Sequence, residues 1–227
     1  MICAIMQPTY LPWAGYFNLI SQADIFVLLD DAQFQKNSWH NRNRILVNHA
    51  PHWITVPVKH FSLDQTIKKT EIDNNPLWRK KHIKLLQQTY CKHPFAKDIL
   101  GILNYIDQEN FSSLSDLNIA LVKWILERLI IKSKIVLSSQ MELEGKRTAR
   151  IVEILKKLNA DTYLSPKGAN DYLEADCFID LTSAVLTFQQ YNPPPYAQYK
   201  HNGFESHLSI VDVVANMGWD AARNYIR

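Results

Sequence analysis

Two short apolar runs near the start of the chain constrain its fold most. Residues 2–6 (ICAIM) and 25–29 (IFVLL) are continuously apolar and lack the polar–apolar alternation of a half-exposed strand. Such runs are typical of parallel strands that are covered on both faces. Residues 15–22 lie between them and are long enough for a short crossover helix. The pattern therefore predicts a strand–helix–strand opening of a mostly parallel α/β sheet.

The rest of the chain continues this alternation, which predicts a single α/β domain over residues 1–227. Polar–apolar patterning predicts a helical layer or insertion over about residues 75–132. Further strands are expected at 53–58, 134–139, 162–165 and 184–191, and further helices at 146–158, 168–174 and 209–218.

Individual residues refine these elements. Within the helical segment, apolar residues recur every fourth position and predict one buried stripe, made of Leu117, Leu121, Ile125 and Leu129. Ser115 is the expected cap of that helix. The last helix is expected to be capped by Ser209 and closed by Gly218. Pro57 limits the strand at 53–58 to a sheet edge or to the strand's end.

Bulk properties exclude several classes of protein. The net charge of +3 over 227 residues is too mild to indicate a nucleic-acid partner by itself. The three cysteines have no CxxC spacing, which argues against a disulfide framework and against zinc. No apolar run reaches the roughly 18–20 residues of a membrane span, and the N-terminus lacks a secretory leader pattern. We therefore expect a cytoplasmic protein without membrane insertion.

The stretch QPTYLPWAGYF follows the first apolar run directly. Gln7 and Tyr10 offer hydrogen bonds, and Tyr10 and Trp13 offer flat surfaces that could stack on a base or a sugar. Gly15 permits close approach of the backbone at a helix start. The alternative is that Trp13 and residues 16–17 fill the core. We predict ligand contacts for Gln7 and Trp13 in particular.

A second polar stretch, DDAQFQKNSWHNRNRI, follows the second apolar run. If residues 39–45 are extended, Arg42 and Arg44 share one face and could clamp a phosphate or carboxylate. Gln33 is a further candidate for ligand binding. The alternative is that the arginines pair with Asp30, Asp31 or surface acids. A metal on Asp30 and Asp31 is disfavoured, because adjacent strand residues point in opposite directions.

A third polar stretch, SPKGANDY at 165–172, follows a later predicted strand. Lys167 at a helix start suits an anion, Asp171 could move a proton, and Tyr172 could contact the same ligand. The alternative is a solvated lysine. Because the carboxyl ends of parallel strands share one edge, we expect the three stretches to form one crevice.

Familiar catalytic templates are absent from the sequence, which contains no Walker loop, GxGxxG, HExxH or GxSxG. The candidate general bases are Asp31, Asp171 and His207. The basic run RKKHIK at 79–84 most simply forms the wet face of a helix, and contact with an RNA backbone is the less favoured alternative. No metal site and no particular cofactor are indicated.

Four blocks of sequence together carry a resemblance to a known family: QPTYLPWAGYFNLISQADIFVLLDDAQFQKNSWHNRNRI, WITVPV, TYLSPKGANDYL and YAQYKHNGFESHLSIVDVVANMG. In this order they resemble the WbqC-like proteins, which are linked with gene clusters for bacterial surface polysaccharide (O-antigen and capsule). The opening is also similar to that of adenylyl- and cytidylyltransferases and pantothenate synthetase. This similarity implies a Rossmann-like, nucleotidyltransferase-like sheet.

The resemblance also shapes the expected chemistry. The similar nucleotidyltransferases carry HxGH at the helix start, where this chain has Trp13 and Tyr16. Because an indole cannot act as a cation beside phosphates, ordinary nucleotidyl transfer is not expected. The leading hypothesis is an enzyme that modifies a nucleotide-activated amino sugar by acyl or aminoacyl transfer. The alternatives are a degenerate nucleotidyltransferase and a non-catalytic module that binds a nucleotide sugar. The expected partner is a nucleotide-linked sugar or acyl donor, and homo-oligomerisation stays open.

Overall fold

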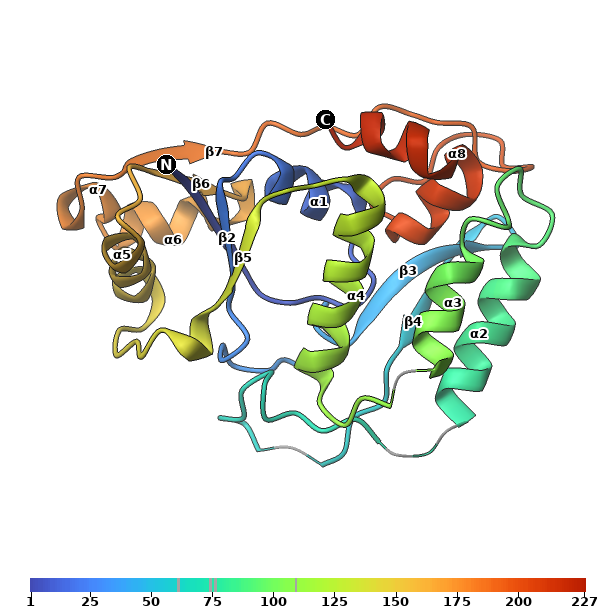
Figure 1. Ribbon diagram of the computed structural model, residues 1–227, viewed down its shortest axis with the longest axis horizontal. Coiled ribbons are helices and arrows are strands. Elements are labelled where there is room, and N and C mark those ends of the chain that lie inside the picture. The colour runs from blue at the N-terminus through green and yellow to red at the C-terminus, as the bar shows by residue number, and fades with distance from the viewer. Residues whose placement is uncertain (61, 74, 76, 109) are drawn as a thin grey trace.

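The computed structural model describes residues 1–60, 62–73, 75, 77–108 and 110–227. Its centre is a five-stranded sheet in the order β5-β2-β1-β6-β7, with every neighbouring pair parallel (Figure 1). The strands are β1 (Ile2–Met6), β2 (Ile25–Leu28), β5 (Lys134–Leu137), β6 (Thr162–Ser165) and β7 (Val185–Phe188). The predicted Rossmann-like α/β sheet is therefore confirmed.

The strand order defines a switch point between β1 and β6. The chain leaves β1 for β2 and β5 on one side, and it returns to form β6 and β7 on the other side. In open α/β sheets ligands bind outside the carboxyl ends of the strands at such a point. The loops that follow β1 and β6 therefore flank the position where a ligand is expected.

Helices cover both faces of the sheet. They are α1 (Ala14–Ser21), α4 (Leu114–Leu129) and α8 (Ile210–Tyr225) on one face, and α5 (Arg147–Leu158), α6 (Asn170–Ala175) and α7 (Phe178–Leu181) on the other. Alternate residues of β1 enter the two cores, because Ala4 packs with the first group while Cys3 and Ile5 pack with the second. This double burial explains why the strand is continuously apolar.

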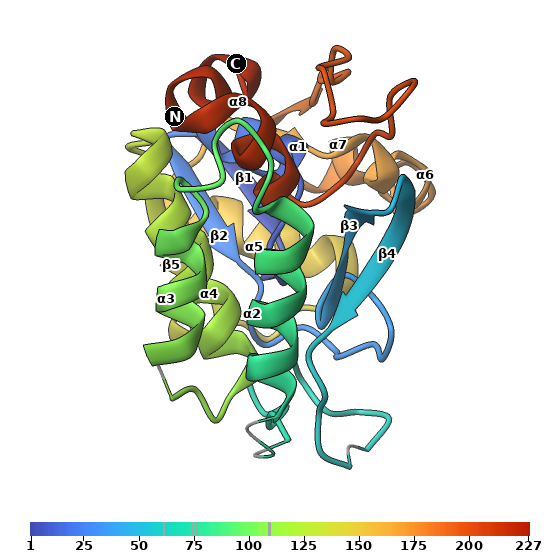
Figure 2. The same ribbon diagram turned by 90° about the vertical axis from the view of Figure 1, so that its right-hand side faces the viewer.

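The connection from β2 to β5 carries the additional elements of the fold. It contains the antiparallel hairpin β3 (Arg42–Val47) and β4 (Ala50–Thr55), then α2 (Leu77–Tyr90), α3 (Leu100–Gln108) and α4. The predicted helical segment over about 75–132 is present, but α4 packs on the sheet as the crossover helix that leads into β5. The hairpin lies beside α2 and forms its own sheet (Figure 2).

Two expectations about element ends need correction. The strand expected at 53–58 is β4, which ends before Pro57 and belongs to the hairpin and not to the main sheet. Helix α4 is capped by Ser113, whose Oγ accepts a hydrogen bond from the Asp116 amide at 3.4 Å, whereas Ser115 is buried inside the helix. The predicted apolar stripe of α4 is fully buried.

The final helix begins as the sequence predicts and ends later. The Ser209 hydroxyl accepts a hydrogen bond from the Val211 amide at 3.3 Å, so the predicted N-cap is confirmed. Gly218 interrupts the helix with φ 75° and ψ 170°, but helical turns resume and continue to Tyr225. A Cβ at this glycine would lie 2.6 Å from the Phe95 ring, so both the backbone angle and the neighbouring ring require glycine.

Two further features concern membrane crossing and the cysteine thiols. Across the described ranges, none of the helices has both the length and the apolar character that a membrane crossing requires. Cys3 is buried, Cys91 and Cys177 are exposed, and all three are free thiols. Burial in an apolar setting raises the pKa of the Cys3 thiol to about 12, so this group stays protonated and unreactive near neutral pH.

Candidate ligand-binding site

The loop after β1 delivers Trp13 to the start of α1. Backbone contacts hold this loop against the segment before α8, because the Ile210 amide donates to the Pro12 carbonyl at 2.8 Å and Trp13 forms an isolated bridge with Ser209. The Trp13 ring is half-buried, and its centroid lies 4.5 Å from that of His207. Chain segments almost 200 residues apart in sequence therefore meet at one aromatic stack.

Gly15 makes room for this indole. A Cβ at position 15 would lie 2.1 Å from the Trp13 ring, so only glycine lets the ring lie over the first turn of α1. The indole therefore occupies the space over the start of α1.

Tyr10 and Gln7 differ in how accessible their side chains are to a ligand. The Tyr10 side chain is fully buried and its hydroxyl lies 3.1 Å from Nδ1 of His82, so the expectation that its ring stacks on a ligand does not fit this placement. Gln7 is half-buried, its carbonyl accepts a hydrogen bond from the Tyr16 hydroxyl at 3.0 Å, and its side-chain amide has no partner among the described residues. Gln7 thus stays available to a ligand.

The hairpin presents Arg42 and Arg44 on one face, as strand alternation predicts. Trp53 is the cross-strand partner of Arg44, and the guanidinium carbon of Arg42 lies 4.1 Å above the Trp53 ring. The corresponding distance for Arg44 is 6.0 Å. Stacking on an indole orients a guanidinium while leaving its N–H edge free for an anion.

The opposite face of the hairpin is tied to the first loop. Asn43 is buried, and its Nδ2 donates to the carbonyls of Tyr10 at 3.0 Å and Leu11 at 2.9 Å. These two hydrogen bonds fix the position of β3 relative to the loop that carries Trp13. The arginine face and the Trp13 stack are consequently parts of one rigid arrangement.

The two arginines differ in their partners. Arg44 donates to Glu205 Oε1 at 3.4 Å and to the Ser206 carbonyl at 3.3 Å. Within the described ranges Arg42 has no acidic partner, and its Nε is buried without an acceptor. The alternative in which the arginines pair with acidic residues thus holds for Arg44, whose partner is Glu205 and not Asp30 or Asp31, while Arg42 remains an uncompensated cation.

His207 has the features of a neutral proton acceptor. Its Nδ1 lies 2.8 Å from the Ser206 hydroxyl, and its Nε2 has no hydrogen-bond partner in the described part of the chain. Desolvation, followed by the charge of Arg44, lowers the pKa of His207 below its ordinary value, while Glu205 opposes the shift. The imidazole is therefore uncharged near pH 7 and can take up a proton.

A buried carboxylate anchors the segment that carries His207. Asp212 is fully buried and accepts hydrogen bonds from the hydroxyls of Tyr196 at 2.6 Å and Tyr90 at 3.0 Å, and from Gln198 at 3.4 Å. Gln198 in turn exchanges two hydrogen bonds with the backbone of Glu205, at 2.8 and 2.9 Å. Burial raises the pKa of Asp212 despite these donors.

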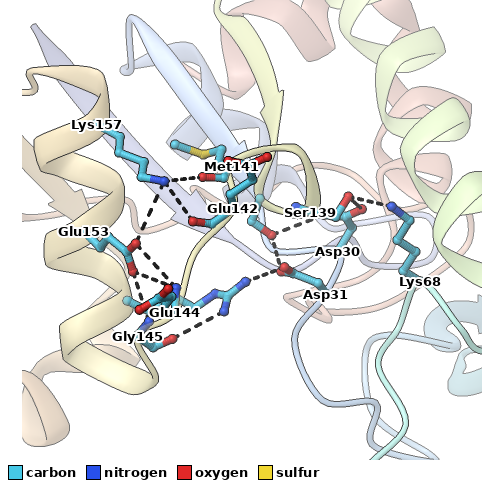
Figure 3. Close-up of polar contacts among 12 residues, drawn as sticks. Asp30, Asp31, Lys68, Ser139, Met141, Glu142, Glu144, Gly145, Glu153 and Lys157 are labelled. Carbon is cyan, nitrogen blue, oxygen red and sulfur yellow. Dashed lines mark hydrogen bonds and ion pairs between the residues drawn. The ribbon is translucent and has the colours of Figure 1, made fainter.

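Asp30 and Asp31 belong to a different cluster, at the carboxyl ends of β2 and β5 (Figure 3). Asp30 accepts from the amide of Ser139 at 3.0 Å and from its hydroxyl at 2.6 Å, while Lys68 donates to the same hydroxyl at 2.9 Å. Asp31 accepts from Ser138 and forms an ion pair with Arg150 on α5.

This polar cluster is saturated by partners from within the chain. Both oxygens of Asp31 have donors, so its proposed role as a free base does not fit its surroundings. The network continues to Glu153, which accepts from the Gly145 amide at 3.0 Å, and to Lys157, which donates to the Met141 carbonyl at 2.6 Å. Within the described ranges, no group of three or more metal-ligating side chains gathers here or elsewhere.

The remaining candidates lie apart from the Trp13 stack. Lys167 and Asp171 are exposed around the start of α6, and Tyr172 is half-buried beside Tyr163. Gln33 is exposed and donates to the Leu63 carbonyl at 2.7 Å. In the described part of the chain, no hydrogen bond or ring contact joins these four residues to Trp13 or to the arginines.

The sequence interpretation missed several residues of the site. The place of Trp53 beside Arg42 depends on the pairing of β3 with β4, which the alternation in WITVPV does not reveal. Glu205 and Asp212 gave no signal in the sequence either, since their roles depend on contacts with residues far away in sequence. Trp39 lies in the turn before β3, with its ring centroid 5.2 Å from that of Trp53.

The parallel sheet with its switch point defines the chain as a Rossmann-like α/β protein, with a candidate ligand site where arginine, histidine and tryptophan side chains meet. The chain belongs to the WbqC-like protein family, whose family model matches residues 7–224. It is 35% identical over 228 residues to "Uncharacterized protein Rv1507c" of Mycobacterium tuberculosis (strain ATCC 25618 / H37Rv), covering 99% of this chain and 96% of that relative. No solved structure matches the chain significantly.

Proposed function

We propose that this protein binds a nucleotide-activated amino sugar between Trp13, His207 and the arginine face of the hairpin, and transfers an acyl or aminoacyl group to it. Such a reaction belongs to the assembly of surface polysaccharide, the context that resemblance to WbqC-like proteins implies. The observation that carries the proposal is the uncompensated guanidinium of Arg42 on the same hairpin face as Arg44, which contacts Glu205 and Ser206 in the segment that carries His207.

Anion binding is the first step of the proposed mechanism. A diphosphate needs cationic donors at a fixed separation, and Arg42 and Arg44 supply two guanidinium groups on one strand face. Arg44 keeps Glu205 as a partner, so its charge is partly balanced, whereas Arg42 gains its first anionic partner from the ligand. Arg42 therefore contributes more to affinity than Arg44.

Proton transfer is the second step. As the amino group of the sugar attacks the acyl carbonyl, a nitrogen–carbon bond forms, the donor's leaving group departs and the amine must lose a proton. His207 suits this task because its Nε2 is free and its lowered pKa keeps the ring neutral. A general base of this kind contributes about 10²- to 10⁴-fold to a rate.

Binding is tested by isothermal titration calorimetry with three pairs of ligands: UDP-N-acetylglucosamine and UDP, dTDP-glucose and dTDP, and GDP-mannose and GDP. At least one nucleotide sugar should bind, and Arg42→Ala should weaken that binding. Lys80→Ala is the matched control, because Lys80 is an exposed cation on α2, away from the site. If no member of the panel binds, the proposed site is overturned; equal losses in both variants would indicate diffuse electrostatics instead.

Catalysis is tested separately with UDP-glucosamine and dTDP-4-amino-4,6-dideoxyglucose, which carry a free amine, with acetyl-coenzyme A or an aminoacyl-tRNA as donor. Nucleoside triphosphates are tested in parallel, and mass spectrometry identifies the products. Acylation of an amino sugar, reduced by His207→Gln without a matching loss of binding, would support the transferase. Tight binding of a nucleotide sugar with no turnover for any acyl or aminoacyl donor would favour the non-catalytic module. Release of pyrophosphate from a nucleoside triphosphate would favour the degenerate nucleotidyltransferase.

A further inference from the structure

Trp39 in the turn before β3 and Trp53 on β4 expose two indole rings to which the proposed function assigns no part of the ligand. Trp39 is 44% exposed and Trp53 is 40% exposed, although indoles are usually well buried. Their ring centroids are 5.2 Å apart, and the rings are tilted by 47°. Two large apolar rings are therefore exposed to solvent side by side, next to the uncompensated charge of Arg42.

The tryptophan pair is held in place by the backbone around it. The Trp39 carbonyl accepts a hydrogen bond from the Tyr10 amide at 3.1 Å, and the Ser38 carbonyl accepts from Arg42 at 3.2 Å. Trp53 stands on β4 with Arg42 stacked at 4.1 Å. Because the backbone that carries the rings is already ordered by these bonds and by the hairpin, little backbone conformational entropy is lost when a ligand binds.

We propose that Trp39 and Trp53 form a saccharide subsite, which receives the sugar ring of the nucleotide-linked substrate while Arg42 holds the adjoining phosphate. This inference rests on the proposed function, because it places the anionic part of the same ligand on Arg42. The electron-rich faces of the indoles attract the weakly positive C–H groups that cover one face of a pyranose.

The geometry favours a sugar over a nucleobase. Two rings tilted by 47° present two planes, which fit the puckered face of a pyranose, whereas a flat base fits only one plane at a time. The charge of Arg42 directly beside the rings requires an anion next to the stacked group. In a nucleotide sugar the diphosphate is joined to the sugar ring, so the indoles can contact the sugar while Arg42 contacts the diphosphate.

The test compares each nucleotide sugar with its parent nucleoside diphosphate by titration calorimetry, in the wild-type protein and in Trp39→Ala and Trp39→Phe. Trp39 is chosen because its removal leaves the Arg42–Trp53 stack in place. Trp39→Ala should weaken the best-binding nucleotide sugar about tenfold and leave its parent diphosphate unchanged. Trp39→Phe, which keeps a ring, should recover most of the affinity. Ile179→Ala removes an exposed apolar side chain on α7 and should change neither ligand.

Three results would overturn the subsite. If Trp39→Ala weakens the nucleotide sugar and the parent diphosphate equally, the rings stack on the base and not on the sugar. If it changes neither ligand while Arg42→Ala still weakens both, the subsite is refuted and the proposed function stands. If the wild-type protein binds no member of the panel, the proposed function fails and the inference fails with it.

Discussion

Two polar clusters lie at the carboxyl side of this sheet and differ in one respect. Around Asp30 and Asp31, every carboxylate oxygen accepts a hydrogen bond or ion pair from within the chain. Around Trp53 and Trp13, Arg42 has an aromatic ring but no counter-ion in the described ranges, and His207 has a free Nε2.

The difference separates stability from binding. Polar groups that satisfy one another leave no capacity for a ligand, and they hold elements together, as the Asp31–Arg150 pair joins the end of β2 to α5. Polar groups that stay unpaired at an aromatic surface cost the folded state some stability and are retained where a partner from outside completes them. We therefore propose that the first, saturated cluster stabilises the fold and that the second, the recognition cluster, binds a ligand.

The largest expected effect comes from removing the cations of the recognition cluster. Arg42→Ala should lower the affinity for a nucleotide sugar by about 10- to 100-fold, because a charge-assisted contact to phosphate is lost. Stability in urea should change by no more than about 0.5 kcal/mol, since Arg42 has no acidic partner to leave behind. Arg44→Ala should have a smaller effect on affinity. A large loss of stability in Arg42→Ala would contradict the comparison.

The reverse pattern is expected in the saturated cluster. Asp31→Ala should destabilise the protein by about 1–2 kcal/mol, because it removes the ion-pair partner of Arg150 and one of the two carboxylates that accept from Ser138. Affinity for a nucleotide sugar should stay at the wild-type value. Urea unfolding followed by circular dichroism gives the first quantity, and calorimetry gives the second. Lost affinity with unchanged stability would show instead that Asp31 contributes to ligand binding.

Gly15→Ala tests whether the position of the Trp13 ring contributes to ligand binding. The added methyl would overlap the indole and displace it from His207, while alanine otherwise suits a helix better than glycine by up to about 1 kcal/mol. We expect a red-shifted tryptophan emission and affinity reduced about three- to tenfold, with little change in the urea midpoint. Unchanged emission and affinity would show that the ring position is unimportant for binding.

The smallest expected effect concerns pH. Burial raises the pKa of Asp212 above the ordinary carboxyl value of about 4, so the folded protein holds this proton more tightly than the unfolded chain. The associated stability is complete below about pH 4 and is lost as pH rises through the raised pKa. Asp212→Asn cannot ionise, so its free energy of unfolding should fall less than that of the wild type between pH 4 and 7. Parallel curves would contradict the raised pKa.

Much of the fold was accessible from local pattern. The strand at 162–165 coincides with β6, and the continuous apolar runs correctly indicate strands buried on both faces. Ser209 was found as a cap because capping depends on neighbouring residues. The hairpin was not recognised as a separate sheet, since strand pairing depends on partners that periodicity does not reveal.

The candidate site was less accessible for the same reason. The shared face of Arg42 and Arg44 follows from strand alternation, and the place of Trp13 after the first strand follows from chain order. The burial of Tyr10 could not be predicted, because it depends on His82 of α2, which lies 72 residues away. The pairing of Asp31 with Arg150 likewise spans 119 residues.

The sequence by itself determined the parallel α/β class, the helical segment after the hairpin, the WbqC-like resemblance and the set of polar stretches near the strand ends. Those properties depend on side-chain periodicity, chain order and neighbouring residues, all of which are local. Only the tertiary structure decided which polar groups find partners within the chain. Burial and pairing are properties of residues brought together by folding, and here they separate the saturated aspartates from the unpaired Arg42.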